Sequence, residues 1–185
     1  MSKIPKSAKR VYKGEIFDVY QWKQKMFDGT YETFERIRRP NTVQVIATEG
    51  NKILITRERQ PAKTGTSLGF LGGMVDSAES PLHAAKRELL EESGRISKRW
   101  KLIGKLNPHS KIDWTVFLFL AGDCKKVAEQ ELDPGEKIKI VKLGFDKFMK
   151  IAPKIDRYNL ANFTMLSYDR KKRAKFRKLA LGSNA

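Results

Sequence analysis

The sequence predicts an α+β fold, an α/β/α sandwich in which a mixed β-sheet lies between helices. The chain has 185 residues, which suffices for one well-packed domain and is too short for two ordinary ones. Short β-branched runs come first, one amphipathic helical segment follows, and further strands precede a helical C-terminal part. This order of strands, helix, strands and helices favours a sheet covered by helices.

The first element is a β-hairpin over residues 15–39. β-Forming residues lie on both sides of Asp28-Gly29, a dipeptide that readily adopts the positive φ angles of a tight turn. We therefore expect residues 1–40 to form an N-terminal hairpin extension. Its aromatic and apolar side chains exceed what a small ribbon buries alone, which predicts a homodimer. They are Tyr20, Trp22, Met26, Tyr31 and Phe34.

Residues 41–167 are expected to form the core domain. Its strands are predicted from short β-branched or apolar runs bounded by turn residues. They cover residues 42–48, 52–57, 101–106, 114–121 and 138–143. Helical composition is found over residues 145–151 and from 159 to about 178.

A single helix is predicted over residues 81–93, after a Gly-, Ser- and Thr-rich loop. Ser80 is a favourable N-cap, Pro81 suits the first helical position and Gly94 can take the left-handed conformation that ends a helix. Leu82 and Leu89 belong to the apolar stripe, whereas the glutamates lie off it. The helix is therefore amphipathic, with an acidic face.

Composition places the protein in a reducing, aqueous compartment. The formal net charge is +17, which attracts polyanions and also suits a polyphosphate substrate; a generally lysine-rich, solvated surface is the alternative. No apolar run is long enough for a membrane span, and the basic N-terminus lacks the apolar stretch of a secretory signal. The single cysteine, Cys124, excludes an internal disulfide. We expect a cytoplasmic protein without a membrane partner.

The basic run from Arg170 to Lys178 distinguishes the last segment, residues 168–185. Lys and Arg are distributed around much of the circumference of the helix that it predicts. Such a helix faces solvent or a polyanion, so nucleic acid is a possible partner here. We expect this segment to be dispensable for hydrolysis of a small substrate.

Three glutamates of the predicted helix share one face. Glu88 and Glu92 are four residues apart and Glu91 is three from Glu88, so their carboxylates project close together. Clustered anions repel one another unless a cation lies among them. Hard oxygen ligands favour Mg²⁺ or Mn²⁺, which polarise phosphoryl oxygens and deliver an activated water to phosphorus. The helix thus predicts a metal-dependent site for phosphate chemistry.

The segment GMVDSAESPLHAAKRELLEESGR, starting at Gly73, resembles the Nudix box, G-x5-E-x7-R-E-U-x-E-E-x-G-U with U a bulky aliphatic residue. Every charged and glycine position of the box is filled, and Arg95 stands where its last aliphatic residue is expected. The resemblance implies a Nudix fold and hydrolysis of X-P-O-P-Y to two phosphates. It also implies a backbone carbonyl ligand at Gly72. The candidate metal ligands are therefore Glu88, Glu92, Glu91 and Gly72, and Arg87 is interpreted as a partner that orients a neighbouring carboxylate.

Outside the box, residues 11–161 resemble the ADP-ribose and nucleoside-diphosphate-sugar pyrophosphatases. The branch has an N-terminal hairpin, a proline after the box near the place of Pro108, and an acidic loop before the last core strand. Two features depart from it: Gly69-Phe70-Leu71-Gly72-Gly73 replaces an E-L-P-A-G-like segment, and Gln60 stands where an arginine is common. The resemblance implies that the substrate is ADP-ribose or a nucleotide sugar, giving a nucleoside monophosphate and a sugar phosphate.

The general base is expected in the loop EQELDPGE, because the box glutamates are committed to metal. Related enzymes draw a glutamate from this loop. Glu136 is the first candidate and Glu131 the second; the alternative is that both are solvated and that metal alone activates the water. The candidate catalytic residues are Glu136, Glu131, Glu91 and Arg87.

The candidate substrate contacts rest on chemistry alone. Trp22 and Phe34 can stack on an adenine, although packing in the core or at an interface is the favoured role for them. His109 lies in a loop that could face substrate, and Arg57 and Arg59 could contact phosphate. Two rival functions remain: an RNA 5′-end pyrophosphohydrolase, favoured by the basic run, and a non-catalytic RNA-binding module, disfavoured because no box carboxylate is missing.

Overall fold

The computed structural model describes residues 4–61 and 64–182. At its centre is a mixed sheet in which β10 runs parallel to β4 and the other neighbouring strands are antiparallel. The strand order is β12 (Lys137–Gly144), β5 (Lys52–Arg59), β4 (Thr42–Glu49), β10 (Val116–Gly122) and β8 (Arg99–Leu106), with β6 (Ser67–Gly69) on β5. The predicted core strands are confirmed within two residues at each end.

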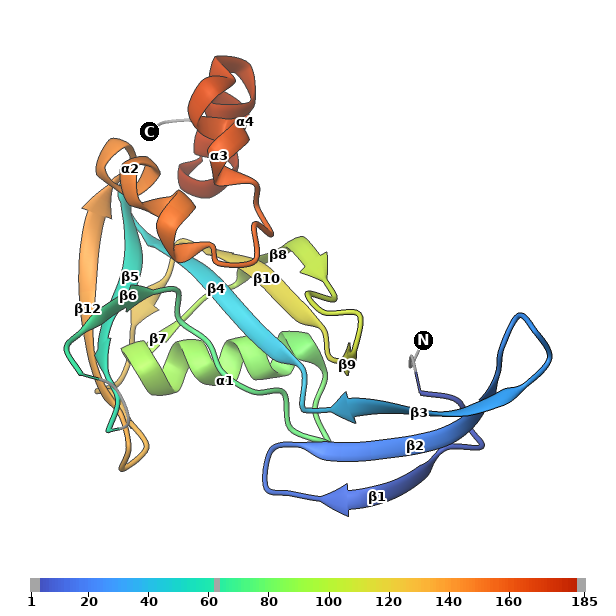
Figure 1. Cartoon of the computed structure of the whole chain (residues 1–185). Coiled ribbons are helices and arrows are strands. Elements are labelled where there is room, and N and C mark those ends of the chain that lie inside the picture. The colour runs from blue at the N-terminus through green and yellow to red at the C-terminus, as the bar shows by residue number, and fades with distance from the viewer. Residues whose placement is uncertain (1–3, 62–63, 183–185) are drawn as a thin grey trace.

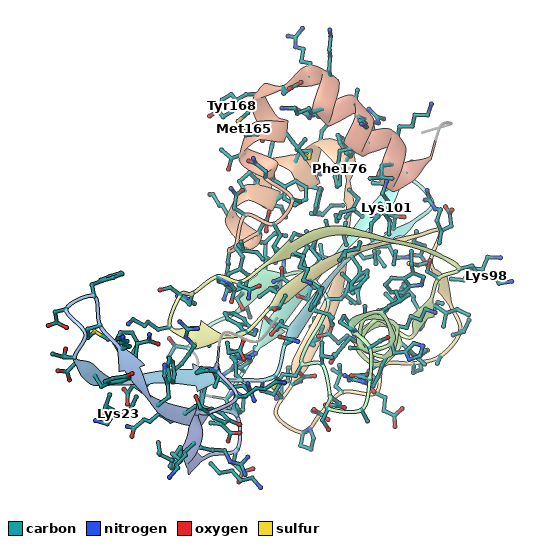
Figure 2. All side chains as sticks on the ribbon, turned by 90° about the vertical axis from the view of Figure 1, so that its right-hand side faces the viewer. Lys23, Lys98, Lys101, Met165, Tyr168 and Phe176 are labelled. Atoms are coloured by element: carbon teal, nitrogen blue, oxygen red, sulfur yellow. The ribbon has the colours of Figure 1, made fainter. Side chains whose placement is uncertain are left out.

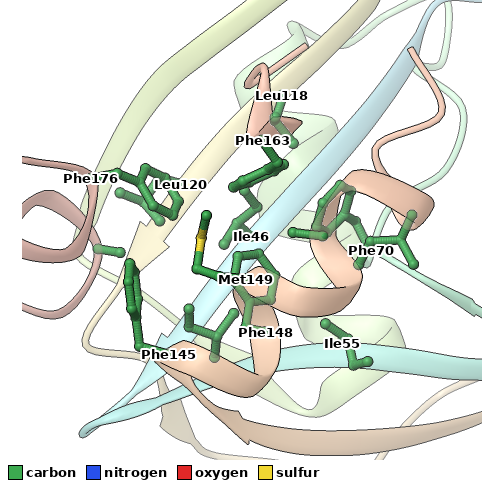
Figure 3. Packing of buried hydrophobic residues seen from close by; sticks show 14 residues of the cluster. Ile46, Ile55, Phe70, Leu118, Leu120, Phe145, Phe148, Met149, Phe163 and Phe176 are labelled. Atoms are coloured by element: carbon green, nitrogen blue, oxygen red, sulfur yellow. The ribbon is translucent and has the colours of Figure 1, made fainter. Parts of the chain in front are cut away.

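Helices cover both faces of this sheet, which confirms the predicted sandwich (Figure 1). On one face α1 (Pro81–Ser93) packs its alanines and Leu89 against Val43, Val45 and Leu54. The other face carries α2 (Phe145–Ile155), α3 (Phe163–Tyr168) and α4 (Arg170–Leu181). Phenylalanines from all three helices meet the sheet there, as Figure 3 shows for Phe148, Phe163 and Phe176.

The N-terminal extension is a separate small sheet that projects from the core (Figure 1). The predicted hairpin is confirmed as β2 (Asp18–Lys25) and β3 (Tyr31–Arg38), with Gly29 at φ +89° in the turn. Two strands that the sequence did not predict complete it: β1 (Lys9–Lys13) beside β2 and β9 (Ile112–Asp113) beside β3. The first three residues of the predicted extension lie outside the described residues. A second small sheet pairs β7 (Arg95–Ile96) with β11 (Lys125–Lys126).

The prediction of one continuous helix from residue 159 to about 178 is wrong. Asn159 and Asn162 have positive φ, and the Asn162 side chain caps α3 by accepting from the Met165 N–H. Asp169 then caps α4 by accepting from the Lys172 N–H at 2.9 Å. Because Asn and Asp side chains compete for backbone N–H groups, they divide the segment into two short helices.

The C-terminal helix is part of the core, which corrects the expectation of a purely solvated run. Phe176 and Ala180 are buried on α4, and the Ala180 carbonyl accepts from the Thr48 hydroxyl at 3.2 Å. Figure 2 shows Phe176 on the inner side of α4, with Met165 and Tyr168 exposed on α3. Two buried positions among the apolar residues of α4 do not show as a stripe in a lysine-rich run. Binding of nucleic acid to its exposed cations stays a prediction.

None of the helices in the described ranges is both long and apolar enough to cross a membrane.

Candidate active site

Helix α1 begins and ends at the residues that its capping sequence predicts. The Ser80 hydroxyl oxygen accepts from the His83 N–H at 3.3 Å, and Pro81 occupies the first turn, where no N–H is needed. Gly94 follows with φ 63°, and its N–H donates to the Leu90 carbonyl oxygen at 2.7 Å. The predicted helix is confirmed, and its caps hold the glutamates of its last turns at defined positions.

Two glycines let the preceding loop lie between β4 and α1. Gly72 has φ +138°, and a Cβ there would overlap the Val43 carbonyl oxygen. The Val43 N–H donates to the Gly73 carbonyl oxygen at 2.9 Å, and a Cβ on Gly73 would overlap the Glu88 carboxylate. A side chain at Gly72 would push the loop away from β4, and one at Gly73 would push it away from α1.

An acidic cavity of about 390 Å³ opens between this loop, the helix and the loop before β12. Its lining residues within the described ranges include eight carboxylates and a single arginine. The lining consists of Glu58, Gln60, Gly72, Gly73, Met74, Asp76, Arg87, Glu88, Glu91, Glu92, Glu131, Asp133 and Glu136. The structure thus brings together all the predicted metal ligands and catalytic residues.

Arg87 connects the acidic side chains of the loop and the helix. Its Nη1 donates to the Glu88 and Glu91 carboxylates, both at 2.9 Å. Its Nη2 donates to the Glu79 carboxylate at 2.7 Å and to the Met74 carbonyl oxygen at 2.9 Å. The hydrogen bond from Arg87 is the main reason why the pKa of Glu79 lies below its usual value. These contacts suit a residue that orients carboxylates.

Two of the helix glutamates are held in a desolvated environment. Glu92 is 5% exposed, and its Oε2 accepts from the Gly72 N–H at 2.7 Å. Burial raises the pKa of Glu92 to about 9, against the effect of this hydrogen bond. Burial likewise raises the pKa of Glu88 to about 7, although Arg87 opposes the rise. Without a cation, both carboxyls therefore keep a proton at pH values where free glutamic acid has lost it.

The donor set fits a hard divalent cation. Its oxygens are carboxylates, which Mg²⁺ and Mn²⁺ prefer, and their mutual repulsion is relieved by positive charge. Across residues 4–61 and 64–182, no three acidic, histidine or cysteine side chains already converge as ligands. Arg87 and the Gly72 N–H occupy oxygens of Glu88, Glu91 and Glu92, so a cation would compete with these protein donors.

The loop before β12 is attached to the end of α1. The Gln130 side chain donates to the carbonyl oxygens of Glu92 and Ile138, and the Glu131 N–H donates to the Glu91 carbonyl oxygen at 2.8 Å. The amide thus joins the helix to the first residues of β12. This attachment holds the loop over the glutamates.

Both candidates for the general base lie in the cavity wall. Glu131 and Glu136 line it together with Asp133. Burial, followed by the charge of Asp133, raises the pKa of Glu136. A carboxyl with a raised pKa is the better proton acceptor when it is ionised. This geometry is compatible with Glu136 as the base.

Comparison with known proteins identifies the family of this chain. A family model described as the NUDIX domain matches residues 38–163, more than half of the chain. The chain belongs to the Nudix family. Residues 73–95 are its Nudix box, and the predicted Nudix fold and hydrolase class are confirmed.

Individual Nudix proteins are similar over different lengths. The ADP-ribose pyrophosphatase of Bacillus subtilis (strain 168) is 25% identical over 166 residues, which are 88% of this chain and 89% of that protein. The 8-oxo-dGTP diphosphatase of Escherichia coli (strain K12) is 33% identical over 109 residues, 57% of this chain and 84% of that protein. A crystal structure of an ADP compounds hydrolase matches with a TM-score of 0.67 and 22% identity, covering 85% and 86% of the two chains, which supports the fold.

The predicted substrate contacts do not line the acidic cavity of the Nudix core. Trp22 and Phe34 lie in the projecting sheet, with ring centroids 6.0 Å apart. His109 stacks on Trp114 at 6.3 Å. Arg57 and Arg59 are exposed on β5, but side chains alternate along a strand and Glu58 takes the cavity side. The two arginines therefore belong to the opposite face of the sheet.

Three acidic residues of the cavity escaped the sequence analysis. Glu58 is one residue from the exposed arginines, and it shares the strand face of Leu54, which packs on the α1 side of the sheet. Asp76 lies inside the box at a position that its pattern leaves open, and Asp133 lies in the acidic loop. The alternation along β5 was the signal that could have identified Glu58.

Proposed function

We propose that this Nudix hydrolase cleaves the diphosphate bond of a nucleoside-diphosphate derivative, ADP-ribose or a nucleotide sugar, with Mg²⁺ or Mn²⁺. The products are a nucleoside monophosphate and a sugar phosphate. The observation that carries the proposal is the similarity to the Bacillus subtilis ADP-ribose pyrophosphatase, because it extends over 88% of this chain and 89% of that protein. The acidic cavity supports it chemically, because it combines metal-type ligands with candidate proton acceptors.

The proposed chemistry divides the cavity into two walls. Glu88, Glu91 and Glu92 would hold the cations with the Gly72 carbonyl oxygen, and bound metal would neutralise phosphoryl charge. Arg87 keeps Glu88 and Glu91 in their rotamers through its fork of N–H groups. The opposite wall would accept the proton of the attacking water, at Glu136 in the first instance.

We also propose a homodimer through the N-terminal sheet. Phe27 is fully exposed in the β2–β3 turn, and Tyr12 and Tyr31 are each 61% exposed on the same small sheet. An apolar surface of this kind on a projecting element is typical of a subunit contact. A second subunit could bring Trp22 or Phe34 to the substrate, which would give these predicted contacts a place.

The proposal is tested with a substrate panel in Mg²⁺ and in Mn²⁺. ADP-ribose, ADP-sugars, 8-oxo-dGTP and 5′-triphosphorylated RNA are compared by kcat/KM, with AMP measured as the product of ADP-ribose. We expect ADP-ribose or a nucleotide sugar to be preferred. Preference for 8-oxo-dGTP, in line with the relative that matches over 57% of this chain, or for RNA would refute the proposed substrate class.

Glu92→Gln isolates the metal site. Loss of a charged ligand should lower kcat by about a thousandfold while the fold survives. Lys86→Gln, a charge change on the exposed side of α1, is the matched control and should retain activity. Near-normal turnover of purified Glu92→Gln would show that α1 does not hold the catalytic metal.

A further inference from the structure

Four cations form two directly opposed pairs on the edge strand β12 and its neighbour β5. In the antiparallel register of β5 and β12, Arg59 is opposite Lys137 and Arg57 is opposite Lys139. Directly opposite residues share a face, and so do residues two apart on one strand. All four side chains are exposed and project from the side away from Glu58. We call this group the cation ladder.

The ladder is not neutralised by neighbouring acids. Within the part of the chain that the structure describes, none of its four side chains takes part in an ion pair. Like charges directly opposite on paired strands destabilise the pair. The strand register therefore holds the ladder together against repulsion, and a bound anion would relieve that repulsion.

One end of the ladder adjoins the acidic cavity. Arg59 and Lys137 line a separate hollow of about 280 Å³ together with Gln60, Pro61, Pro134 and Gly135. Gln60 also lines the acidic cavity, and Glu136 next to Gly135 does so as well. β5 and β12 lie side by side and antiparallel, so β5 ends and β12 begins at this boundary (Figure 1). A ligand held in the acidic cavity could extend past Gln60 onto the ladder.

We propose that the cation ladder binds a second phosphate group of the substrate, a phosphomonoester separate from the scissile diphosphate. Residues two apart on a strand are separated by ~6.6 Å and cross-strand pairs by ~5 Å, so four long side chains converge on one dianion. Arginine forks match phosphate oxygens bidentately. This inference rests on the proposed function for the occupant of the acidic cavity.

The composition of the hollow favours a phosphate over a nucleobase. No aromatic side chain is found among the described residues that line it, and single-stranded nucleic acid is generally held by stacking on aromatic rings. In a nucleoside-diphosphate substrate, the 2′ and 3′ oxygens of the adenosine ribose can carry a phosphomonoester outside the scissile bond. The ladder therefore indicates a substrate phosphorylated on that ribose.

The test compares ADP-ribose with ADP-ribose phosphorylated on the 2′ or the 3′ oxygen of its adenosine. The double variant Arg57→Gln/Lys139→Gln removes the half of the ladder that does not line the hollow. The double variant Lys52→Gln/Lys147→Gln is the matched control, since it removes two exposed cations from the opposite end of β5 and from α2.

For the wild type we expect the KM for one phosphorylated substrate to be at least about tenfold lower than the KM for ADP-ribose. ADP-ribose lacks the additional phosphate and therefore lacks its charge-assisted contacts with the ladder. The ladder variant should abolish this preference without changing kcat or the KM for ADP-ribose more than about twofold. The control should keep the preference. Equal KM values for all three substrates in the wild type, or equal effects of the two double variants, would overturn the proposal.

Calorimetric titration in EDTA separates the ladder from the hydrolytic proposal. The phosphorylated probe should bind the metal-free wild type more tightly than ADP-ribose does, and the ladder variant should lose this difference. That result without hydrolysis of ADP-ribose or of any nucleotide sugar would refute the proposed function and keep the ladder. Hydrolysis of ADP-ribose without tighter binding of either phosphorylated probe would refute the ladder alone.

The Tm of the ladder variant should equal or exceed the Tm of the wild type, because the substitutions remove repulsion between like charges. A Tm several degrees lower would contradict the inferred repulsion within the ladder.

Discussion

The raised pKa of Glu92 predicts how the stability of the metal-free protein depends on pH. In the folded chain burial raises this pKa from 4.5 to about 9. The unfolded chain loses its Glu92 proton near the lower value. Between the two values the folded state binds more protons than the unfolded state, so the free energy of unfolding falls as pH rises. Glu92→Gln cannot ionise and should lack this contribution.

Between pH 7 and pH 9, the change in the free energy of unfolding reports on Glu92 more than on Glu88. Burial raises the pKa of Glu88 to about 7, so its contribution is largely complete at the start of the interval. One proton difference corresponds to about 1.4 kcal/mol per pH unit, and half-ionisation at the upper limit reduces the total. The wild type should therefore lose about 2 kcal/mol relative to Glu92→Gln over this interval.

Urea unfolding at pH 7, 8 and 9 in EDTA measures the difference directly. Glutamine at position 92 retains an oxygen that can accept the Gly72 N–H, so the substitution leaves this hydrogen bond in place. Lys86→Gln, the exposed control on α1, should leave the stability of the protein changing with pH in parallel with the wild type. Parallel curves for the wild type and Glu92→Gln would refute the buried, protonated state of Glu92.

Magnesium provides an independent check of the same reasoning. A cation stabilises the ionised carboxylates, and its binding releases the protons that the metal-free site holds. Addition of Mg²⁺ should raise wild-type stability most at pH 9 and change Glu92→Gln little. Proton release on binding, measured by calorimetry in buffers of different ionisation enthalpy, should be present in the wild type and reduced in the variant. Metal binding without proton release would contradict the raised pKa values.

Three further predictions follow from the fold and the cavity. Glu136→Gln should lower kcat by about a hundredfold or more at saturating metal with metal affinity unchanged, and Glu131→Gln less; near-normal turnover in both excludes this loop from proton transfer. Phe176→Ala should destabilise the protein by about 3 kcal/mol in urea unfolding, because the ring is buried against Phe145 and Phe163, whereas a loss below about 0.5 kcal/mol would show that α4 is dispensable. Light scattering at micromolar concentration should give the mass of a dimer, and a monomeric mass with full activity would rule out the proposed contact.

The sequence alone determined those features that depend on residues close together along the chain. Ser80, Pro81 and Gly94 predict the limits of α1, and Asp28-Gly29 predicts the hairpin turn, because capping and turn preferences act within a few residues. The spacing of the helix glutamates likewise predicts that they share one face, since the period of a helix is fixed. These local rules led to the acidic site and its chemistry.

Only the tertiary structure decided which side chains are buried and which strand faces meet. Glu92 was expected on a polar helix face, yet the loop at Gly72 covers it and raises its pKa. Phe176 is buried because α4 folds back onto strands from the middle of the chain. The cation ladder exists because β5 pairs with β12, about eighty residues later in the sequence. Such pairings depend on contacts between distant segments, so no local pattern along the chain contains them.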